Sequence, residues 1–446
     1  MSPIFTPPMS PERAHEIARD FDLRDLPADF YANPYPVYAA LRQSQPIRHM
    51  PDGSYFLTRY ADLMAVYRHA QAFSSDKQVE FAPKYNIGSY SISNPAPLFE
   101  HHTTSLVFND PPLHTRVRRL IMGALTRRAI AHMEPALIKL VDGLLDVLQD
   151  RGQGDLIEDF ASAIPVEVIG NLLGVPHSDR GLLRAWSLAI LGALEPKLDW
   201  AQHELGNRAV TEMIAYLREL VSLRRRHPGD PEHDVLTRLI QGETDGEKLS
   251  EVELLQNCIF ILNAGHETTT NLIGNSLVCL QEYPQARLAL TQGLQANRGD
   301  SVAQQALLDL AIDEFLRFES SNQLGNRRAV QASEVGGMRL PVGALVTLCI
   351  GAANRDPAQF DQPEELRLNR ADNRHLAFGL GIHQCAGLSL AKLEGRIAIG
   401  RFLQRFPNYQ LNASPTRGGR ARFRGFLKAR SEEHTSELQS HHDLVC

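Results

Sequence analysis

The chain has 446 residues, of which 43% are hydrophobic and 22% charged, and its formal net charge is −6. This is the composition of a globular protein with a large core, and the interspersed charges argue against a nucleic-acid partner. The five cysteines are scattered without a Cys-x-x-Cys pair, which argues against a zinc site or a disulfide framework and favours a reducing compartment.

The N-terminus lacks a secretory signal, because no basic stretch followed by an apolar one occurs in its first residues. No segment approaches the roughly 20 apolar residues that cross a bilayer. We therefore expect a cytoplasmic protein without a membrane partner. No Gly/Ser-rich or Pro-rich linker divides the chain, so we place a single domain at 20–429 after an N-terminal extension at 1–19.

The first predicted elements are a strand in SYFLTRY (54–60) and a mostly helical region from about Pro111 to Leu316. At the start of that region, DPPLHTRVRRL (110–120) places His114 and Arg118 four residues apart, on one helix face. The chain is thus predicted to be mainly α with a smaller β region, an α+β fold.

A long helix is predicted over 248–284. Ser250 and Glu253 have the spacing of a capping box and Pro284 ends the pattern, which gives a helix of about 33 residues, about 50 Å long. Inside it, the small and polar residues AGHETT (264–269) interrupt an apolar stretch.

Two further patterns follow the long helix. IDEFLRFES (312–320) places Glu314 and Arg317 three residues apart on one helix face. GGMRLPVGALVTLCI (336–350) has the pattern of a β-hairpin that closes through a Pro-Val-Gly turn.

The most informative segment is FGLGIHQCAG (378–387), which surrounds Cys385 with glycines. Glycines permit positive φ and let backbone N–H groups turn toward a sulfur, and the helical pattern from Leu388 on places the thiol just before a helix N-terminus. This arrangement stabilises an anionic thiolate. The alternative is a structural cysteine in a Gly-rich turn.

This segment resembles the haem-binding loop of the cytochrome P450 superfamily, a resemblance that extends over roughly residues 20–429. It implies the P450 fold, with the long helix over the haem, and it implies that Cys385 is the thiolate ligand of the iron of haem b. The resemblance carries over to the other loop positions that match the pattern: Phe378, Gly379, Gly381, His383 and Gly387.

Within the long helix, AGHETT resembles the family's oxygen-binding segment, where the helix bulges to leave a groove. Ala264 and Gly265 then contact the cofactor, Glu267 is the acid that relays protons, and Thr268 is the alcohol that holds an ordered water. Two alternatives stay open: Glu267 as an ordinary ion-pair partner, and Thr268 bonding back to the preceding helical turn.

The same resemblance assigns Glu314 and Arg317 to the family's buried structural pair. Its third member comes from a Pro-x-x-aromatic segment, where this chain has PEEL (363–366) with Glu365 at the expected position, and Arg367 is a possible substitute. The haem carboxylates need basic partners, and the resemblance proposes four: His114, Arg118, Arg327 and His383.

The implied function is a haem-thiolate monooxygenase that uses dioxygen to oxidise a small organic substrate. The chain has no dinucleotide-binding fingerprint and no iron–sulfur cysteine set, so electrons from NAD(P)H must arrive through a separate ferredoxin or flavodoxin and its reductase. Three basic residues near the thiolate form the predicted dock: Arg116, Arg119 and Lys392. We expect a monomer.

Two other functions stay open, a peroxide-driven peroxygenase and a non-catalytic haem sensor or carrier. The retained pair Glu267 and Thr268 counts against both. Substrate recognition is expected from 77–107 and 185–200. In the first segment Lys77, Lys84 and the tyrosines suit an acidic or aromatic substrate, or else belong to a solvated loop. The end, 430–446, is polar and aperiodic and resembles a translated sequencing adapter, so we interpret it as a non-native or disordered tail.

Overall fold

The structure is a computed structural model that describes residues 9–85, 96–231, 234–242 and 246–432. The helices are α1 (Pro11–Asp20), α2 (Ala28–Ala32), α3 (Tyr35–Ser44), α4 (Tyr60–Arg68), α5 (Gln78–Lys84), α6 (Pro97–Thr104), α7 (Leu113–Ala124), α8 (Arg127–Arg151), α9 (Ala163–Leu172), α10 (Arg180–Gly192), α11 (Trp200–Arg226), α12 (Val235–Gln241), α13 (Glu251–Glu282), α14 (Pro284–Ala296), α15 (Ser301–Phe318), α16 (Ile350–Ala353) and α17 (Leu388–Arg405).

Short helical turns and strands complete the architecture. The turns are η1 (Leu106–Phe108), η2 (Leu156–Ala161), η3 (His177–Asp179) and η4 (Gly381–His383). The strands are β1 (Ile47–His49), β2 (Tyr55–Leu57), β3 (Phe73–Ser74), β4 (Gln153–Asp155), β5 (Leu324–Ala329), β6 (Ser333–Val335), β7 (Met338–Leu340), β8 (Leu345–Cys349), β9 (Gln410–Leu411), β10 (Thr416–Arg417), β11 (Phe426–Lys428) and β12 (Arg430–Glu432).

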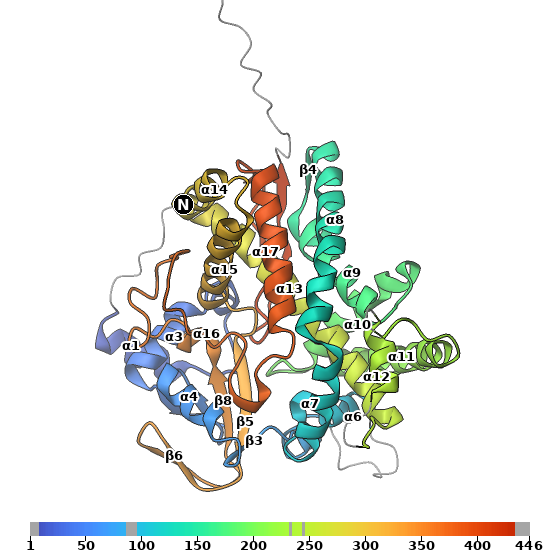
Figure 1. The fold of residues 1–446 in the computed structure, drawn as a ribbon. Helices are drawn as coiled ribbons and strands as arrows, with labels where there is room; N and C mark the ends of the chain where they lie inside the picture. The colour runs from blue at the N-terminus through green and yellow to red at the C-terminus, as the bar shows by residue number, and fades with distance from the viewer. Residues whose placement is uncertain (1–8, 86–95, 232–233, 243–245, 433–446) are drawn as a thin grey trace, which may run out of the picture.

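The predicted α+β class is confirmed. Segments distant in sequence form a five-stranded sheet of order β1-β2-β8-β5-β3, in which β2 and β8 are parallel and the other pairs antiparallel. Figure 1 shows α1, α3 and α4 beside β3, β5 and β8 on the left, and α7 to α12 on the right. The largest apolar core joins the helices, and two smaller cores lie around the sheet.

The long helix α13 connects these parts of the molecule. Ser250 caps its first turn and forms a capping box with Glu253, as the sequence predicts, while Pro284 begins the next helix rather than lying in a loop. α13 contacts α9, α10, α11, α14, α15 and α17, and most of its residues are buried. A helix buried on nearly all sides gives a fixed wall against which a site can be built.

The predicted hairpin in 336–350 is wrong, although both of its strands exist. β7 pairs with β6 across the turn Gly336–Gly337, where both residues have positive φ, whereas β8 lies between β2 and β5 in the main sheet. β8 lies in the centre of that sheet, and four of its five residues are buried. A central strand makes its hydrogen bonds to both neighbours and has none left for β7.

The boundaries of the folded part also differ from the predicted ones, which lie between residues 19 and 20 and between residues 429 and 430. α1 begins at Pro11 and its Ala14 and Ala18 are buried against the rest of the chain, so this part of the predicted extension belongs to the fold. At the other end β12 pairs with both β4 and β9, so the predicted tail does not begin at Arg430. The rest of the tail, 433–446, lies outside the described residues.

Candidate active site

The Cys385 loop is held by backbone hydrogen bonds between its two ends. The N–H of Cys385 donates to the carbonyl of Phe378 (2.9 Å), and Gly379 and Gly381 both have positive φ. A side chain at Gly381 would also lie 2.6 Å from the carbonyl oxygen of Tyr67. The loop therefore requires glycine at these two positions for backbone reasons, whatever it binds.

The loop ends at Gly387, directly before α17, and this places the thiol of Cys385 near a helix N-terminus. Burial raises the pKa of the thiol, while the N–H groups of Gly387 and Leu388 and the guanidinium of Arg118 act in the opposite direction. Of the four cysteines in the described residues, Cys385 alone is exposed, and the space it faces is an internal cavity. A surface thiol does not have this environment.

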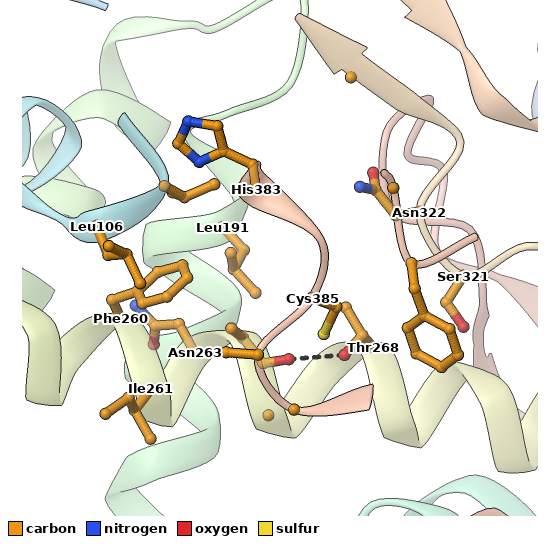
Figure 2. A pocket seen from close by; sticks show the side chains of 18 of the residues that line it. Leu106, Leu191, Phe260, Ile261, Asn263, Thr268, Ser321, Asn322, His383 and Cys385 are labelled. Atoms are coloured by element: carbon orange, nitrogen blue, oxygen red, sulfur yellow. Dashed lines mark hydrogen bonds between the residues drawn. The ribbon is translucent and has the colours of Figure 1, made fainter. Parts of the chain in front are cut away.

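That cavity, of about 350 Å³, lies between the Cys385 loop and α13 (Figure 2). Thr268 lines it from α13, together with Ala264 and Gly265, and Phe378 lines it from the loop. The remaining lining is largely aliphatic and aromatic, as is usual for small-molecule sites. The structure thus brings together two motifs that lie more than a hundred residues apart in the sequence.

The four predicted basic residues gather at one edge of this site. The rings of His114 and His383 are 4.1 Å apart, Arg118 donates to the carbonyl of Gln384 (2.6 Å), and Arg327 donates to that of Asn326 (2.8 Å). Among the described residues, neither arginine has a carboxylate within ion-pair distance.

The same four residues leave buried polar atoms without partners. Both ring nitrogens of His114 and Nε2 of His383 are buried and make no hydrogen bond to any part of the chain that the structure describes. Burial lowers the pKa of both histidines, and the neighbouring cations lower it further. Unpartnered donors and unpaired guanidiniums around one cavity edge fit a group with two carboxylates, and the thiol fits a metal, so the residues present fit haem.

Glu267 lies on the other side of α13 from the main cavity. Its Oε1 accepts from Nη1 of Arg420 (2.6 Å), and its Oε2 is buried without a partner among the described residues. It lines a separate small cavity together with Arg184 and His266. Burial raises the pKa of Glu267, although Arg420 counteracts part of this rise. A buried carboxyl with a raised pKa is suited to carrying a proton.

Thr268 adopts the local hydrogen bond that was one of the two alternatives for it. Its hydroxyl donates to the carbonyl of Ala264 (2.6 Å) while its side chain still faces the main cavity (Figure 2). The bulge expected here is absent, since α13 is α-helical throughout Glu251–Glu282. Gly265 lets α9 approach, because a Cβ there would lie 2.4 Å from Cδ1 of Ile169.

The pair Glu314–Arg317 is fully buried and joined by two hydrogen bonds of 2.8 Å. The third member is neither of the two residues considered: Glu365 offers its backbone carbonyl to Arg317, and the side chain of Arg367 pairs outward with Asp361 and Glu365. Arg370 instead donates to Glu314 (3.0 Å). The family's Pro-x-x-aromatic pattern does not predict it, because Arg370 comes five residues after the expected position, that of Glu365.

Sequence reasoning missed further polar residues in the main cavity. Asn263 is 2% exposed, has no partner for its side-chain amide among the described residues, and lies one turn before Glu267 on α13. Figure 2 shows it among the lining side chains. Lys77, for which contact with a substrate and a solvated loop are the two expectations, is buried and lines the cavity, so the solvated loop is wrong for it; Arg422 also lines the cavity. The sequence signal that could have found Asn263 is a polar residue within an apolar stretch of the long helix.

The proposed dock on the thiolate side is weakened by the ion pairs that two of its members form. Arg116 pairs with Glu253, and Lys392 pairs with Asp313. Charges that are neutralised by partners on the same chain contribute less to steering an acidic protein. The positive charge that Arg116 and Lys392 would offer to a redox partner is therefore partly neutralised within the chain.

The comparisons with known proteins agree with this geometry. The family model described as Cytochrome P450 matches residues 191–416. A relative from Saccharopolyspora erythraea named Cytochrome P450 107B1 is 41% identical over 69% of this chain and 71% of the relative. The biotin biosynthesis cytochrome P450 of Bacillus subtilis is 34% identical over 86% of this chain and 92% of the relative.

Solved structures give the same result. P450BioI in complex with hexadec-9Z-enoic acid ligated acyl carrier protein has a TM-score of 0.81 and 32% identity, covering 91% of this chain and all of that chain. Other relatives are named as a vitamin D(3) 25-hydroxylase from Pseudonocardia autotrophica and as the monooxygenase PikC from Streptomyces venezuelae. None of the helices in the described ranges combines the length and the apolar character that a membrane span needs.

The relatives are named as monooxygenases and hydroxylases, so they do not favour a peroxygenase or a sensor function for this chain. The cofactor of the family is haem, with electrons that derive from NAD(P)H through partner proteins, and its substrates are small molecules. This chain belongs to the cytochrome P450 family, as a haem-thiolate monooxygenase.

Proposed function

We propose that Cys385 is the thiolate ligand of the haem iron, and that the haem carboxylates are held by His114, Arg118, Arg327 and His383. The main support is the cavity itself, in which the thiol lies on one wall, Thr268 on the other, and the unpaired basic residues at the edge. Haem supplies, when bound, the activation of dioxygen. The chain supplies the thiolate, the charge balance and the exclusion of water.

Proton delivery is proposed to run from Glu267 to the cavity side of α13. Burial raises the pKa of Glu267 and favours its protonated form, whereas Arg420 bonds to Oε1 and favours the ionised form, so this carboxyl can take up and release a proton at Oε2. The small cavity shared with His266 gives this carboxyl a place for exchange with water. The hydroxyl of Thr268 then accepts a proton at Oγ1 and releases its own into the main cavity, which its side chain lines.

The substrate is proposed to be a small, mostly apolar organic molecule, and the electron donor a separate ferredoxin or flavodoxin with its reductase. Relatives are named for acting on vitamin D(3) and 6-deoxyerythronolide B, which supports apolar substrates with few polar groups. The apolar lining of the cavity supports the same class. A monomeric state, a cytoplasmic location and the single domain stay predictions.

The thiolate assignment is tested by the reduced, carbon monoxide-bound spectrum. The unmodified protein should show the Soret band of a cysteinate-ligated complex, and Cys385→Ser should lose it, because a serine oxygen does not replace the sulfur. Cys279→Ala is the matched control, since this cysteine is buried in α13 and does not belong to the Cys385 loop. Loss of the band in the control together with its persistence in Cys385→Ser would refute the assignment.

The proton relay is tested with Thr268→Ala. We expect normal haem content but product formation per electron reduced several-fold, with hydrogen peroxide released instead, because the hydroxyl that receives protons is removed. The measurement compares NADH consumed, product formed and peroxide released in a reconstituted ferredoxin system. Ser276→Ala is the control, since its hydroxyl bonds to the carbonyl of Leu272 on the same helix (2.7 Å) and its side chain lines neither the main cavity nor the small one. Unchanged coupling in Thr268→Ala would contradict the relay.

A further inference from the structure

Arg422 is a partly buried cation on the wall of the main cavity. It lies between β10 and β11, and its guanidinium donates to the carbonyls of Leu194 (3.1 Å) and Leu324 (2.7 Å) and to the side-chain oxygen of Asn326. These three acceptors are neutral. They use three of the five N–H groups of the guanidinium, so at least one N–H on each terminal nitrogen stays available for another acceptor.

The nearby acidic groups do not face the cavity. Glu195 accepts the backbone N–H groups of Ala421 and Arg422, and Glu80 pairs with Lys77 (2.7 Å). Neither glutamate belongs to the cavity lining, whereas Lys77 and Arg422 do. Two cationic side chains of this cluster therefore belong to the cavity lining, while its two glutamates do not.

The lining of the cavity contains more basic than acidic side chains. Its lysine and arginines are Lys77, Arg118, Arg327 and Arg422. Its acidic residue is Glu394, where burial raises the pKa well above the usual value and so disfavours the charged form. Part of the segment 77–107 that is expected to recognise substrate, residues 86–95, lies outside the described residues.

Arg118 and Arg327 would hold the two haem carboxylates at the edge near His383, and Glu80 pairs with Lys77. Arg422 is bonded instead to Leu194, which follows α10, and to β5. Burial lowers the pKa of Arg422, and the carboxylates of Glu195 and Glu80 counteract part of this effect. Since the guanidinium itself donates to neutral acceptors only, a carboxylate in the cavity would give it a charged partner with hydrogen-bonding geometry.

We propose that this enzyme binds substrates that carry a carboxylate on an otherwise apolar body, and that Arg422 is the residue that pairs with this carboxylate. The inference rests on the proposed function, since it takes the main cavity as the substrate site. The planar guanidinium, already oriented by three hydrogen bonds, offers a carboxylate paired N–H groups at little further loss of side-chain freedom. The apolar lining then holds the rest of the substrate against α13.

The test compares two ligands that differ only in the charge of the head group. Ferric holoenzyme at pH 8 is titrated with dodecanoate and with dodecanamide, and binding is followed by the spectral change on displacement of water from the haem. We expect the unmodified protein to bind dodecanoate at least tenfold more tightly than the amide. In Arg422→Gln the two ligands should bind within twofold of each other, with haem content unchanged.

Two further variants make the test specific. Lys428→Gln, an exposed residue on the neighbouring strand β11, should keep the preference for dodecanoate. Arg422→Lys should keep part of it, because the charge stays and the paired geometry is lost, and this variant decides the question if Arg422→Gln does not hold haem. An unmodified protein without a preference for the acid, or a preference that survives unchanged in the Arg422 variants, would overturn the inference.

The outcome also separates this inference from the proposed function. If the carbon monoxide-bound spectrum lacks the cysteinate band, the proposed haem site fails. If that band is present and dodecanoate binds no better than dodecanamide, only the role of Arg422 fails. Loss of haem in both Arg422 variants, with the acid preference of the unmodified protein retained, would assign Arg422 to the haem carboxylates and overturn the inference.

Discussion

At the scale of single residues, Glu267 and Thr268 are neighbours in sequence that face different spaces. Thr268 lines the main cavity, while Glu267 lies with Arg420 in a small cavity on the other side of α13. The ion pair and the local threonine hydrogen bond had been treated as alternatives to a functional role. Both interactions are present, and with them Glu267 and Thr268 still lie where each side chain can take up or release a proton.

The ion pair between Arg420 and Glu267 should make stability depend on pH. Burial raises the pKa of Glu267, so its contribution to stability is present at low pH and is lost as pH rises through the raised value. Arg420 offsets this loss by stabilising the ionised form. Arg420→Gln should therefore cost about 2 kcal/mol of the free energy of unfolding at pH 8 and clearly less at pH 5, as measured by urea unfolding.

A control for this pH dependence is Arg405→Gln, which removes an exposed ion pair with Asp146. Surface pairs of this kind contribute at most about 1 kcal/mol. The loss in this variant should be small at both pH 5 and pH 8, because solvent screens a pair at the surface at either pH. Equal losses at the two pH values in Arg420→Gln would contradict the raised pKa of Glu267.

At the scale of elements, the start of α13 was predictable because its determinants are local. Ser250 accepts from the N–H of Glu253 (3.2 Å), and the side chain of Glu253 accepts from the N–H of Ser250 (2.8 Å). The strands at 336–350 were predictable for the same reason. Their partners were not, because strand pairing depends on residues from distant parts of the chain, such as Tyr55–Leu57 in β2.

The cap of α13 can be tested with Ser250→Ala. Removal of the hydroxyl leaves one N–H of the first turn without its acceptor, so the free energy of unfolding should fall by about 1 kcal/mol. Urea unfolding followed by circular dichroism measures this change. Ser178→Ala is the control, because its exposed hydroxyl donates to Asp179 and caps no helix. An equal loss in both variants would show that the cap contributes nothing specific.

At the scale of the whole molecule, the buried network around Glu314 ties α15 to the segment before the Cys385 loop. Arg317 donates to the carbonyls of Asn354 and Pro363, and Arg370 and Asn373 donate to Glu314. Buried charges in such a network are stable only while each has its partners. The network therefore couples the stability of the helical part to the geometry of the thiolate loop.

Arg370→Gln should disrupt this coupling. Because Glu314 is fully buried, the loss of one of its two cations should lower the free energy of unfolding by roughly 3 kcal/mol and accelerate haem release. Urea unfolding and the rate of haem transfer to apomyoglobin measure the two effects. Arg374→Gln, four residues later, removes an exposed pair with Asp372 and should change neither quantity. Identical behaviour of the two variants would exclude Arg370 from the network.

The sequence by itself determined the class of fold, the long capped helix and the loop around Cys385, because spacing, caps and glycine positions act within a few residues. Tertiary structure decided which cavity each polar residue of α13 lines, why Arg370 rather than Glu365 or Arg367 completes the buried network, and that Arg422 belongs to the lining of the main cavity. Those outcomes depend on which distant segments share a buried, low-dielectric space. No local pattern contains that information.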